Sequence, residues 1–408
     1  MASCGAAVGS PTTTGAASGF QLVSTTVLKR ADGTLFDGQN PGLLNGNKAV
    51  LGNSIDSEGI ARRANGNFLI SDEYGPSIYE FKADGTFVRA FKQPNNLVPR
   101  ENNGTLNYVD GRGTIATGRQ DNRGYEGLTI SRDGRTAFAI LQDPLVNEGR
   151  GDQGRRSQNL RIVRFDIASG EATGQFIYQL EHRDQINARI PGTANDFSEN
   201  DQGRSIGVSS ITQLADGSFL VIERDNRGLG EADPTGAGLV GSKRVYRIRL
   251  DGATDVTNVS LAGSNTLPTG VVPVSKSLYL DVQAQVGAAN VTEKLEGLTF
   301  GRTLGDGSLS LLLISDNDMS VTQGDNPNRR DVCTSGFGGV SALVQIGDPC
   351  PLVDGVQTAL IPTSIYAFRV AGASAVGVVP EPASWALMIA GFGLAGVAVR
   401  RRGLVRIA

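Results

Sequence analysis

The chain has 408 residues and a formal net charge of −3 at pH 7. With 38 Lys and Arg against 41 Asp and Glu, it lacks the basic excess that would favour nucleic acid as a partner. Its 54 glycines, set against 3 methionines and 1 tryptophan, indicate many tight turns and few helices. We therefore expect an all-β fold, which this length allows as one large domain.

The N-terminal part of the chain is low in complexity. Residues 1–19 are rich in Gly, Ala, Ser and Thr, which predicts a flexible segment. The first five residues show neither the charged nor the apolar region of a secretory signal. Strand candidates follow at 20–28, 34–36 and 49–51.

Asp-Gly dipeptides lie between apolar runs along much of the chain. Such a dipeptide is a strong hairpin signal, because glycine takes the positive φ that the turn requires. We therefore expect antiparallel hairpins to dominate the fold. Examples are Asp32-Gly33, Asp37-Gly38, Asp84-Gly85, Asp133-Gly134, Asp216-Gly217, Asp251-Gly252 and Asp306-Gly307.

A four-strand unit repeats along the chain. Its first copy predicts strands at 59–62, 67–71, 77–82 and 86–91, which is the content of one propeller blade. The pair Glu58-Gly59 that opens it returns as Glu126-Gly127 and Glu296-Gly297, with Ser210-Ile211 in the corresponding place of another copy. The third strand returns at 161–165, 244–248 and 364–368.

The repeats are further apart than one blade requires. The polar segments between them read as long loops or as degenerate blades. Further strands could come from the N-terminal candidates and from residues 271–282. We therefore predict a β-propeller of about six blades over residues 20–370. The intervening segments are 95–124, 146–159, 183–207 and 321–357.

Each repeat brings polar side chains to one end of its first hairpin. The first strand begins at the Glu-Gly pair and the second ends in a polar cluster, so antiparallel pairing places both at one rim. If the first strands line the propeller axis, all four clusters converge on one mouth of the central channel. The expected neighbours are Glu58 with Asp72 and Glu73, Glu126 with Gln142 and Asp143, Ser210 with Glu223, Asp225 and Asn226, and Glu296 with Asp316, Asn317 and Asp318.

Such a rim is a candidate metal site. Gathered carboxylates repel one another unless a cation lies between them. Oxygen ligands without histidine or cysteine suit Ca²⁺ or another hard cation better than zinc or copper. A bound Ca²⁺ would hold a phosphate or carbonyl oxygen and sharpen the acidity of a water, which supports ester hydrolysis. The predicted metal ligands are Glu58, Asp72, Glu126, Glu223, Asp225, Asn226, Glu296, Asp316 and Asp318.

The same rim supplies the predicted catalytic groups. Arg224 is the best cation for an anionic substrate group, with an ion pair inside the rim as the alternative. For the acids, the alternative is that they mark turns and cap backbone amides. The predicted catalytic residues are Glu58, Glu73, Glu126, Glu223, Arg224 and Glu296.

Other enzyme classes find little support. The single histidine, His182, lies in a charged loop, and no Gly-x-Ser-x-Gly elbow occurs, so a serine-hydrolase triad is not expected. No phosphate-binding P-loop or dinucleotide fingerprint stands at a strand-to-helix turn. Cys333 and Cys350 could form a loop-closing disulfide in an oxidising compartment or remain two thiols, with Cys4 left over.

The C-terminal part resembles a PEP-CTERM sorting tail. Val379-Pro380-Glu381-Pro382 precedes an apolar run at 383–399, and Arg400-Arg401-Arg402 follows at once. The resemblance implies export, a transient inner-membrane anchor at 383–408 with the domain on the periplasmic side, and processing by an exosortase at the linker 371–382. Release to the cell surface or extracellular matrix would follow. It also leads us to expect a secretory signal ahead of this sequence, and a buried core helix is the alternative for the apolar run.

The repeats resemble the phytase-like esterase family of β-propellers over about residues 45–370. The resemblance implies a propeller that hydrolyses phosphate esters or other esters. One departure is Ser210, where the family often has an acid beside the Ser-Ile pair, which weakens this corner as a metal ligand. The matching segments are 57–60 with 70–76, 125–128 with 141–145, 222–226, and 294–298 with 315–318.

The predicted rim and the family resemblance allow three functions. The first is an exported, Ca²⁺-dependent hydrolase of small phosphate esters. The second is a lactonase-type carboxyl-ester hydrolase that uses the same cation. The third is a non-catalytic propeller that binds exopolysaccharide or a surface protein.

Overall fold

The computed structural model describes residues 24–36, 38, 49, 54–109, 113–323 and 328–371. The predicted flexible segment 1–19, the tail 383–408 and all but the first residue of the linker 371–382 lie outside the described residues. Within the described part the fold is all-β with few, short helices, as the composition predicts.

Three sheets have four antiparallel strands each, paired in the order of a meander. A fourth has three strands, because the chain leaves it after the second strand and returns for the third. The first sheet contains β1 (Ser57–Arg62), β2 (Phe68–Asp72), β3 (Ser77–Phe81) and β4 (Phe87–Ala90). The second contains β5 (Tyr125–Ile130), β6 (Thr136–Leu141), β7 (Asn159–Asp166) and β8 (Ala172–Gln179). The third contains β9 (Ile206–Gln213), β10 (Phe219–Asp225), β11 (Lys243–Arg249) and β12 (Ser275–Asp281), and the fourth β13 (Lys294–Thr303), β14 (Leu309–Asp316) and β20 (Ile365–Val370).

The excursion between β14 and β20 forms two small sheets of its own. Its disulfide joins Cys333 to Cys350 with 5.6 Å between the Cα atoms, which confirms the disulfide among the two alternatives. The strands are β15 (Asp331–Thr334), β16 (Ser341–Val344) and β19 (Ala359–Leu360), and β17 (Leu352–Val353) with β18 (Val356–Gln357). The helices of the described chain are α2 (Arg183–Asn187), α3 (Val282–Val286) and the 3₁₀ turns η1 (Gly154–Arg156), η2 (Glu199–Asp201), η3 (Ala288–Asn290) and η4 (Asp318–Ser320).

The Asp-Gly turns form as predicted where the structure describes them. Gly85 and Gly307 have φ near +80°, which a residue with a Cβ rarely adopts. In the same two turns, an Asp84 oxygen accepts the Thr86 N–H at 2.9 Å and an Asp306 oxygen accepts the Ser308 N–H at 2.9 Å. The aspartate thus stabilises the backbone reversal that the glycine permits.

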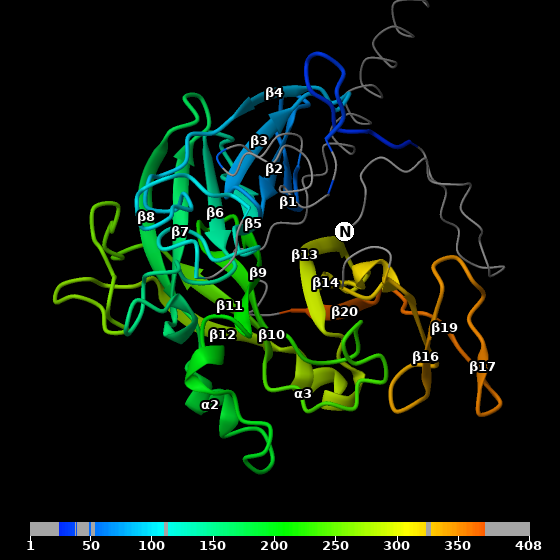
Figure 1. Cartoon of the computed structure of the whole chain (residues 1–408). Coiled ribbons are helices and arrows are strands. Elements are labelled where there is room, and N and C mark those ends of the chain that lie inside the picture. Colours follow the sequence, from blue (N-terminus) through cyan, green and yellow to red (C-terminus); the bar gives the residue numbers. More distant parts are fainter. Residues whose placement is uncertain are drawn as a thin grey trace, which may run out of the picture.

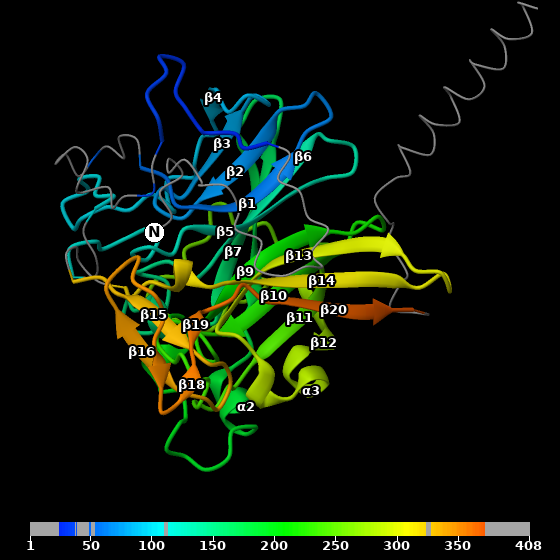
Figure 2. The same cartoon turned by 90° about the vertical axis from the view of Figure 1, so that its right-hand side faces the viewer.

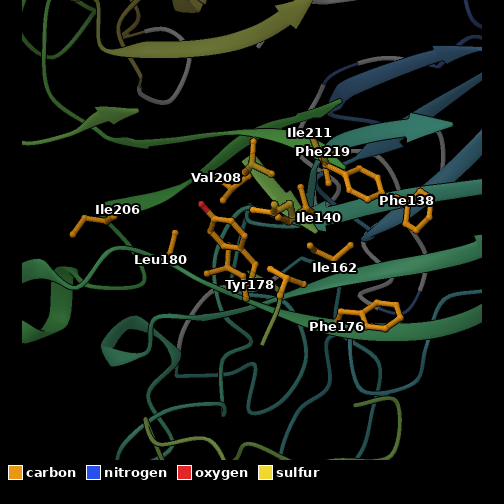
Figure 3. Packing of buried hydrophobic residues seen from close by; sticks show 14 of the residues in the cluster. Phe138, Ile140, Ile162, Phe176, Tyr178, Leu180, Ile206, Val208, Ile211 and Phe219 are labelled. Atoms are coloured by element: carbon orange, nitrogen blue, oxygen red, sulfur yellow. The ribbon is translucent and has the colours of Figure 1, made fainter. Parts of the chain in front are cut away.

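The four larger sheets follow one another around the molecule (Figure 1). Their first strands are innermost: β1 packs against β5, β5 against β9, and β9 against β13. The three hydrophobic cores that join successive sheets lie between them. Figure 3 shows the core between the second and third sheets, where Phe138 and Phe219 meet edge to face at 4.8 Å between ring centroids.

The predicted segment 271–282 is explained by β12, the outer strand of the third sheet. Four sheets of blade type occur in the described part of the chain, so a ring of about six blades stays a prediction.

Figure 2 shows β1 and β13 in separate sheets. No helix in the described ranges is long and apolar enough to cross a membrane.

Candidate functional site

A cavity of about 960 Å³ lies where the first strands of all four larger sheets begin. Residues of β1, β5, β9 and β13 line it, as do loops that follow the second strands. Its lining carries ten carboxylates against four cationic side chains, so the cavity is acidic. The carboxylates belong to Asp56, Glu58, Glu73, Asp121, Glu126, Glu231, Glu293, Glu296, Asp316 and Asp318.

A β-bulge at the same place in each innermost strand directs side chains to this cavity. The pairing shifts between Ser57 and Ile60 in β1, between Tyr125 and Gly127 in β5, and between Leu295 and Gly297 in β13. The residue displaced by the bulge is Glu58, Glu126 or Glu296, respectively. Bulges re-aim side chains in this way beside many functional sites.

The third sheet has the same bulge but a different residue. Here the shift lies opposite Ile222 and Glu223, and the displaced residue of β9 is Ser209. The Ser209 hydroxyl donates to the Leu295 carbonyl of the next sheet. The third sheet therefore contributes no acid at this position, in agreement with the departure noted at Ser210.

The glycines after Glu58 and Glu126 allow the first strands of neighbouring sheets to approach closely. A Cβ on Gly59 would lie 2.7 Å from the Leu128 Cβ, and one on Gly127 would lie 2.7 Å from the Ile211 N. In both cases the obstacle belongs to the innermost strand of the following sheet. The Glu-Gly pair therefore combines an acid for the cavity with space for the next strand.

Three carboxylates gather at the β1 corner of the cavity. One oxygen each from Asp56, Glu58 and Glu73 lies within 4.8 Å of the others. Burial raises the pKa of Glu58 well above its usual range, and the carboxylates of Glu126 and Glu296 raise it further. Burial likewise raises the pKa of Glu73 to about 8, against the opposing charge of Arg123. We call these three residues the acidic triad.

Asp56 was not among the predicted residues. It stands two positions before Glu58, and alternation along an extended segment places both side chains on one side. Burial raises the pKa of Asp56 as well. The alternation in Asp56-Ser57-Glu58 predicts that Asp56 faces the cavity, provided that the extended segment begins at residue 56 and not at the Glu-Gly pair.

Asp72 has a structural role instead of the predicted metal-binding one. Its side chain is fully buried and accepts backbone N–H groups from Asp56 at 2.9 Å, Tyr74 at 3.2 Å and Gly75 at 3.0 Å. Burial raises the pKa of Asp72 to about 7, against these backbone donors, which lower it. The turn-capping alternative therefore describes Asp72.

Glu126 is the second residue of β5 and is more deeply buried, at 3% exposed. One of its oxygens accepts from Gln142 Nε2 at 2.9 Å, which brings the predicted pair together. Its Oε2 is buried and has no hydrogen-bond partner among the described residues. Burial raises the pKa of Glu126 well above its usual range, and Glu73 and Glu296 raise it further. The carboxyl is thus positioned to hold or release a proton toward the cavity.

Arg224 joins two of the predicted acids. Its guanidinium lies 2.8 Å from a Glu296 oxygen and 3.8 Å from a Glu126 oxygen. Burial raises the pKa of Glu296, and the charge of Arg224 opposes this effect. Of the two alternatives for Arg224, the ion pair within the rim is present.

The β13 corner neutralises its own acids. Lys294 Nζ lies 2.6 Å from an Asp318 oxygen and 3.5 Å from an Asp316 oxygen. Burial lowers the pKa of Lys294, but Glu296 and Asp318 outweigh it, so that the pKa is raised overall. Asp316 and Asp318 line the cavity as predicted, yet both already pair with the Lys294 ammonium group. Lys294 was missed, although its position two before Glu296 places it on the same side of the strand.

Glu223 and Asp225 do not line the cavity, which corrects their prediction as rim ligands. Glu223 accepts from the Tyr178 hydroxyl at 2.6 Å and pairs with Lys276. Asp225 pairs with Lys243 at 3.0 Å. Because successive side chains of a strand point to opposite faces, β10 can direct Arg224 into the cavity only by turning Glu223 and Asp225 away. Asn226, after the end of β10, does line the cavity.

Asp143, a predicted neighbour of Glu126, and His182, which was predicted to lie outside the site, are both absent from the lining of the main cavity. Asp143 is buried and pairs with Arg123 at 3.1 Å, so it supports an arginine of the cavity wall and does not line the main cavity itself. His182 caps α2 by accepting the Asp184 N–H at 3.3 Å and is not part of the cavity lining.

Chemically, the arrangement offers oxygen ligands and proton donors in one acidic space. The triad presents three carboxylate oxygens close enough to share one hard cation of the Ca²⁺ type. Burial raises the pKa of Glu126, which favours the protonated carboxyl that a general acid needs. These are the groups that hydrolysis of an ester requires.

Two family models match the chain. The model of the phytase-like family, described as esterase-like activity of phytase, matches residues 8–319. A PEP-CTERM protein-sorting motif matches residues 378–402, which implies processing by an exosortase and supports export.

Similar proteins are distant. An uncharacterised secreted protein of Arthroderma benhamiae is 33% identical over 190 residues, which cover 42% of this chain and 35% of that protein. The chain thus spans about a third of the length of this curated relative. A candidate gluconolactonase aligns over 71% of this chain and 63% of its own at 13% identity and a TM-score of 0.27. A streptogramin B lyase aligns over 72% and 70% at 13% identity and a TM-score of 0.25.

Proposed function

Because the chain belongs to the phytase-like family, we propose that it is an exported, Ca²⁺-dependent hydrolase of phosphate esters or other small esters. The reaction takes place in the acidic cavity at one end of the innermost strands. The propeller itself is proposed to be a closed ring of about six blades, of which four sheets are described. Export is followed by transient anchoring in the inner membrane and by release after processing of the tail.

The observation that carries this proposal is the acidic triad. Three carboxylates whose pKa values are raised by burial lie within 4.8 Å of one another, and Arg123 pairs with one of them, Glu73, at 3.4 Å. Close beside them, the buried Oε2 of Glu126 lacks a hydrogen-bond partner in the described chain. Such a set is costly unless it binds a cation or protons.

The residues that would hold the ion are Asp56, Glu58 and Glu73. A bound Ca²⁺ would polarise an ester oxygen or a water, as a Lewis acid does. Glu126 holds a proton at its carboxyl and can pass it to a leaving oxygen in the cavity. Arg224 fixes Glu296 and Glu126 relative to each other, so that the reacting groups are positioned before substrate enters.

A specific observation favours carboxyl esters as the second candidate substrate class. In each innermost strand, the residue two positions after the bulged one is aliphatic and lines the cavity. These residues are Ile60, Leu128, Ile211 and Leu298. Ile60 is 69% exposed, although isoleucine is normally buried, whereas the other three are 9% exposed or less. A lactone or an acylated alcohol would cover the exposed Ile60, which a bare phosphate ester would leave in contact with water.

Parallel assays separate these candidates. Purified protein is stripped with EDTA, and turnover of p-nitrophenyl phosphate, acetate and octanoate is measured before and after Ca²⁺ is returned. We expect activity only with Ca²⁺. Preference for octanoate over phosphate would favour the carboxyl-ester class, and full activity in excess EDTA would overturn the cation-dependent mechanism. Thermal stabilisation by Ca²⁺ without turnover of any substrate would instead favour a non-catalytic propeller that binds exopolysaccharide or a surface protein.

A further inference from the structure

A small side pocket of about 20 Å³ adjoins the acidic cavity and has the opposite character. Three guanidinium groups, those of Arg123, Arg204 and Arg224, line it against the single carboxylate of Asp143. Arg123 and Arg224 line the main cavity as well, so the two spaces meet at these two side chains. Pocket size allows about one water-sized atom, such as a single oxygen.

Two of the three arginines are not fully satisfied by the protein, whereas Arg123 pairs with Asp143 at 3.1 Å and with Glu73 at 3.4 Å. Arg224 is 8% exposed, and its Nε has no hydrogen-bond partner among the described residues. Arg204 forms no ion pair in the described part of the chain, and its guanidinium donates to the Asp121 carbonyl at 3.3 Å. Gln142 also lines both spaces, at the junction between them.

The cations also repel one another. Burial lowers the pKa of Arg204, and the neighbouring charge of Arg123 lowers it further. Arg123 acts in the same direction on the pKa of Arg224, although the acids around Arg224 outweigh it. A bound anion would offset the repulsion between these guanidinium groups and accept a hydrogen bond from the free donor. Such charged hydrogen bonds are strong in a site that holds little water.

From these contacts we infer that the side pocket is an oxyanion subsite that takes one oxygen of a phosphate group. The other phosphate oxygens face the main cavity, on the side where Glu73 and the rest of the acidic triad lie. Three separate guanidinium groups suit a tetrahedral phosphate, which presents more acceptors than a planar carboxylate. The identity of this group as part of the substrate rests on the proposed function, whereas binding of the anion does not.

Anion binding is therefore measured without turnover. EDTA-treated protein is titrated calorimetrically with inorganic phosphate and, separately, with acetate at low ionic strength. We expect phosphate to bind, and Arg204→Gln to weaken it about tenfold or more, the loss of a charged hydrogen bond. The matched control is Arg132→Gln, which removes the same charge from an exposed hairpin turn and should leave the affinity unchanged. The stabilisation by Ca²⁺ should persist in Arg204→Gln, which shows that the variant is folded.

Each result bears on one proposal. Absence of phosphate binding to the wild type, equal affinity for phosphate and acetate, or unchanged affinity in Arg204→Gln overturns the phosphate subsite. Phosphate binding that depends on Arg204, in a protein without turnover, supports the subsite and counts against the proposed hydrolase. Ca²⁺-dependent turnover of p-nitrophenyl phosphate with an unchanged KM in Arg204→Gln supports the proposed hydrolase and overturns the phosphate subsite.

Discussion

Two corners of the cavity arise from the same repeated motif and differ in how their charge is balanced. At the β1 corner, Asp56, Glu58 and Glu73 lie within 4.8 Å of one another, and Arg123 from a loop pairs with one of them, Glu73, at 3.4 Å. At the β13 corner, Lys294 lies between Asp316 and Asp318. The difference shows that a repeated Glu-Gly and Asp pattern does not by itself define a metal site. The residue two positions before the acid is Asp56 at the β1 corner and Lys294 at the β13 corner, so only the second strand adds a cation of its own to its acids.

The largest expected effect comes from Glu58→Gln. Loss of one of three ligand carboxylates should weaken Ca²⁺ binding about tenfold or more, because ligand charge sets the affinity of oxygen sites. The measurement is the rise in Tm as Ca²⁺ is added to EDTA-treated protein. Asp316→Asn is the matched control at the self-neutralised corner and should retain most of the Ca²⁺ response. Equal losses in both variants would contradict the distinction between the corners.

A second substitution makes the β13 corner resemble the β1 corner. Lys294→Met leaves Asp316 and Asp318 without their cation, and we expect it to lower the free energy of unfolding in EDTA by about 1–2 kcal/mol, since the group is only partly buried. Added Ca²⁺ should restore more stability to this variant than to the wild type. Urea unfolding with and without Ca²⁺ measures both changes. If stability falls and Ca²⁺ restores nothing extra, the freed acids do not form a cation site.

The smallest expected effect is a pH dependence that belongs to the β1 corner. Burial raises the pKa of Glu73 from 4.5 to about 8, so between these pH values the folded protein binds a proton that the unfolded chain releases. Stability contributed by this proton is complete below about pH 4.5 and is lost as pH rises through about 8. The Tm in EDTA should therefore fall over this window, and Ca²⁺ stabilisation should grow as the carboxylates ionise.

Glu73→Gln tests the assignment of that slope. The amide cannot titrate, so part of the decline in Tm should disappear in the variant. A smaller decline should remain at lower pH, because burial also raises the pKa of Asp72 to about 7. An unchanged profile from pH 4.5 to 8 would show that Glu73 is not the group responsible.

Local patterns predicted much of the fold from the sequence. The Asp-Gly turns, the strands of the first repeat and the recurring third strands occur where they were expected. These features depend on the conformational freedom of glycine and on alternation of apolar residues, which act over a few residues. The disulfide between Cys333 and Cys350 was one of two alternatives, and only the structure distinguished them.

The candidate site was predicted less completely. Glu58, Glu126 and Glu296 were found because the Glu-Gly pair repeats where each first hairpin begins. Asp72 and Glu223 were predicted for the rim because they stand near strand ends, but both side chains are buried against other partners. Chain position alone does not give the face of a strand when a bulge shifts the register by one residue.

The sequence by itself determined the hairpins, the repeat and the acids that open each innermost strand, since these depend on local backbone preferences. Only the tertiary structure decided which charges share the cavity. Arg123 and Arg204 come from loops between sheets, and Asp56 and Lys294 face the cavity because β1 and β13 begin beside it. The Coulomb interaction that joins these groups acts through space and is independent of their separation along the chain.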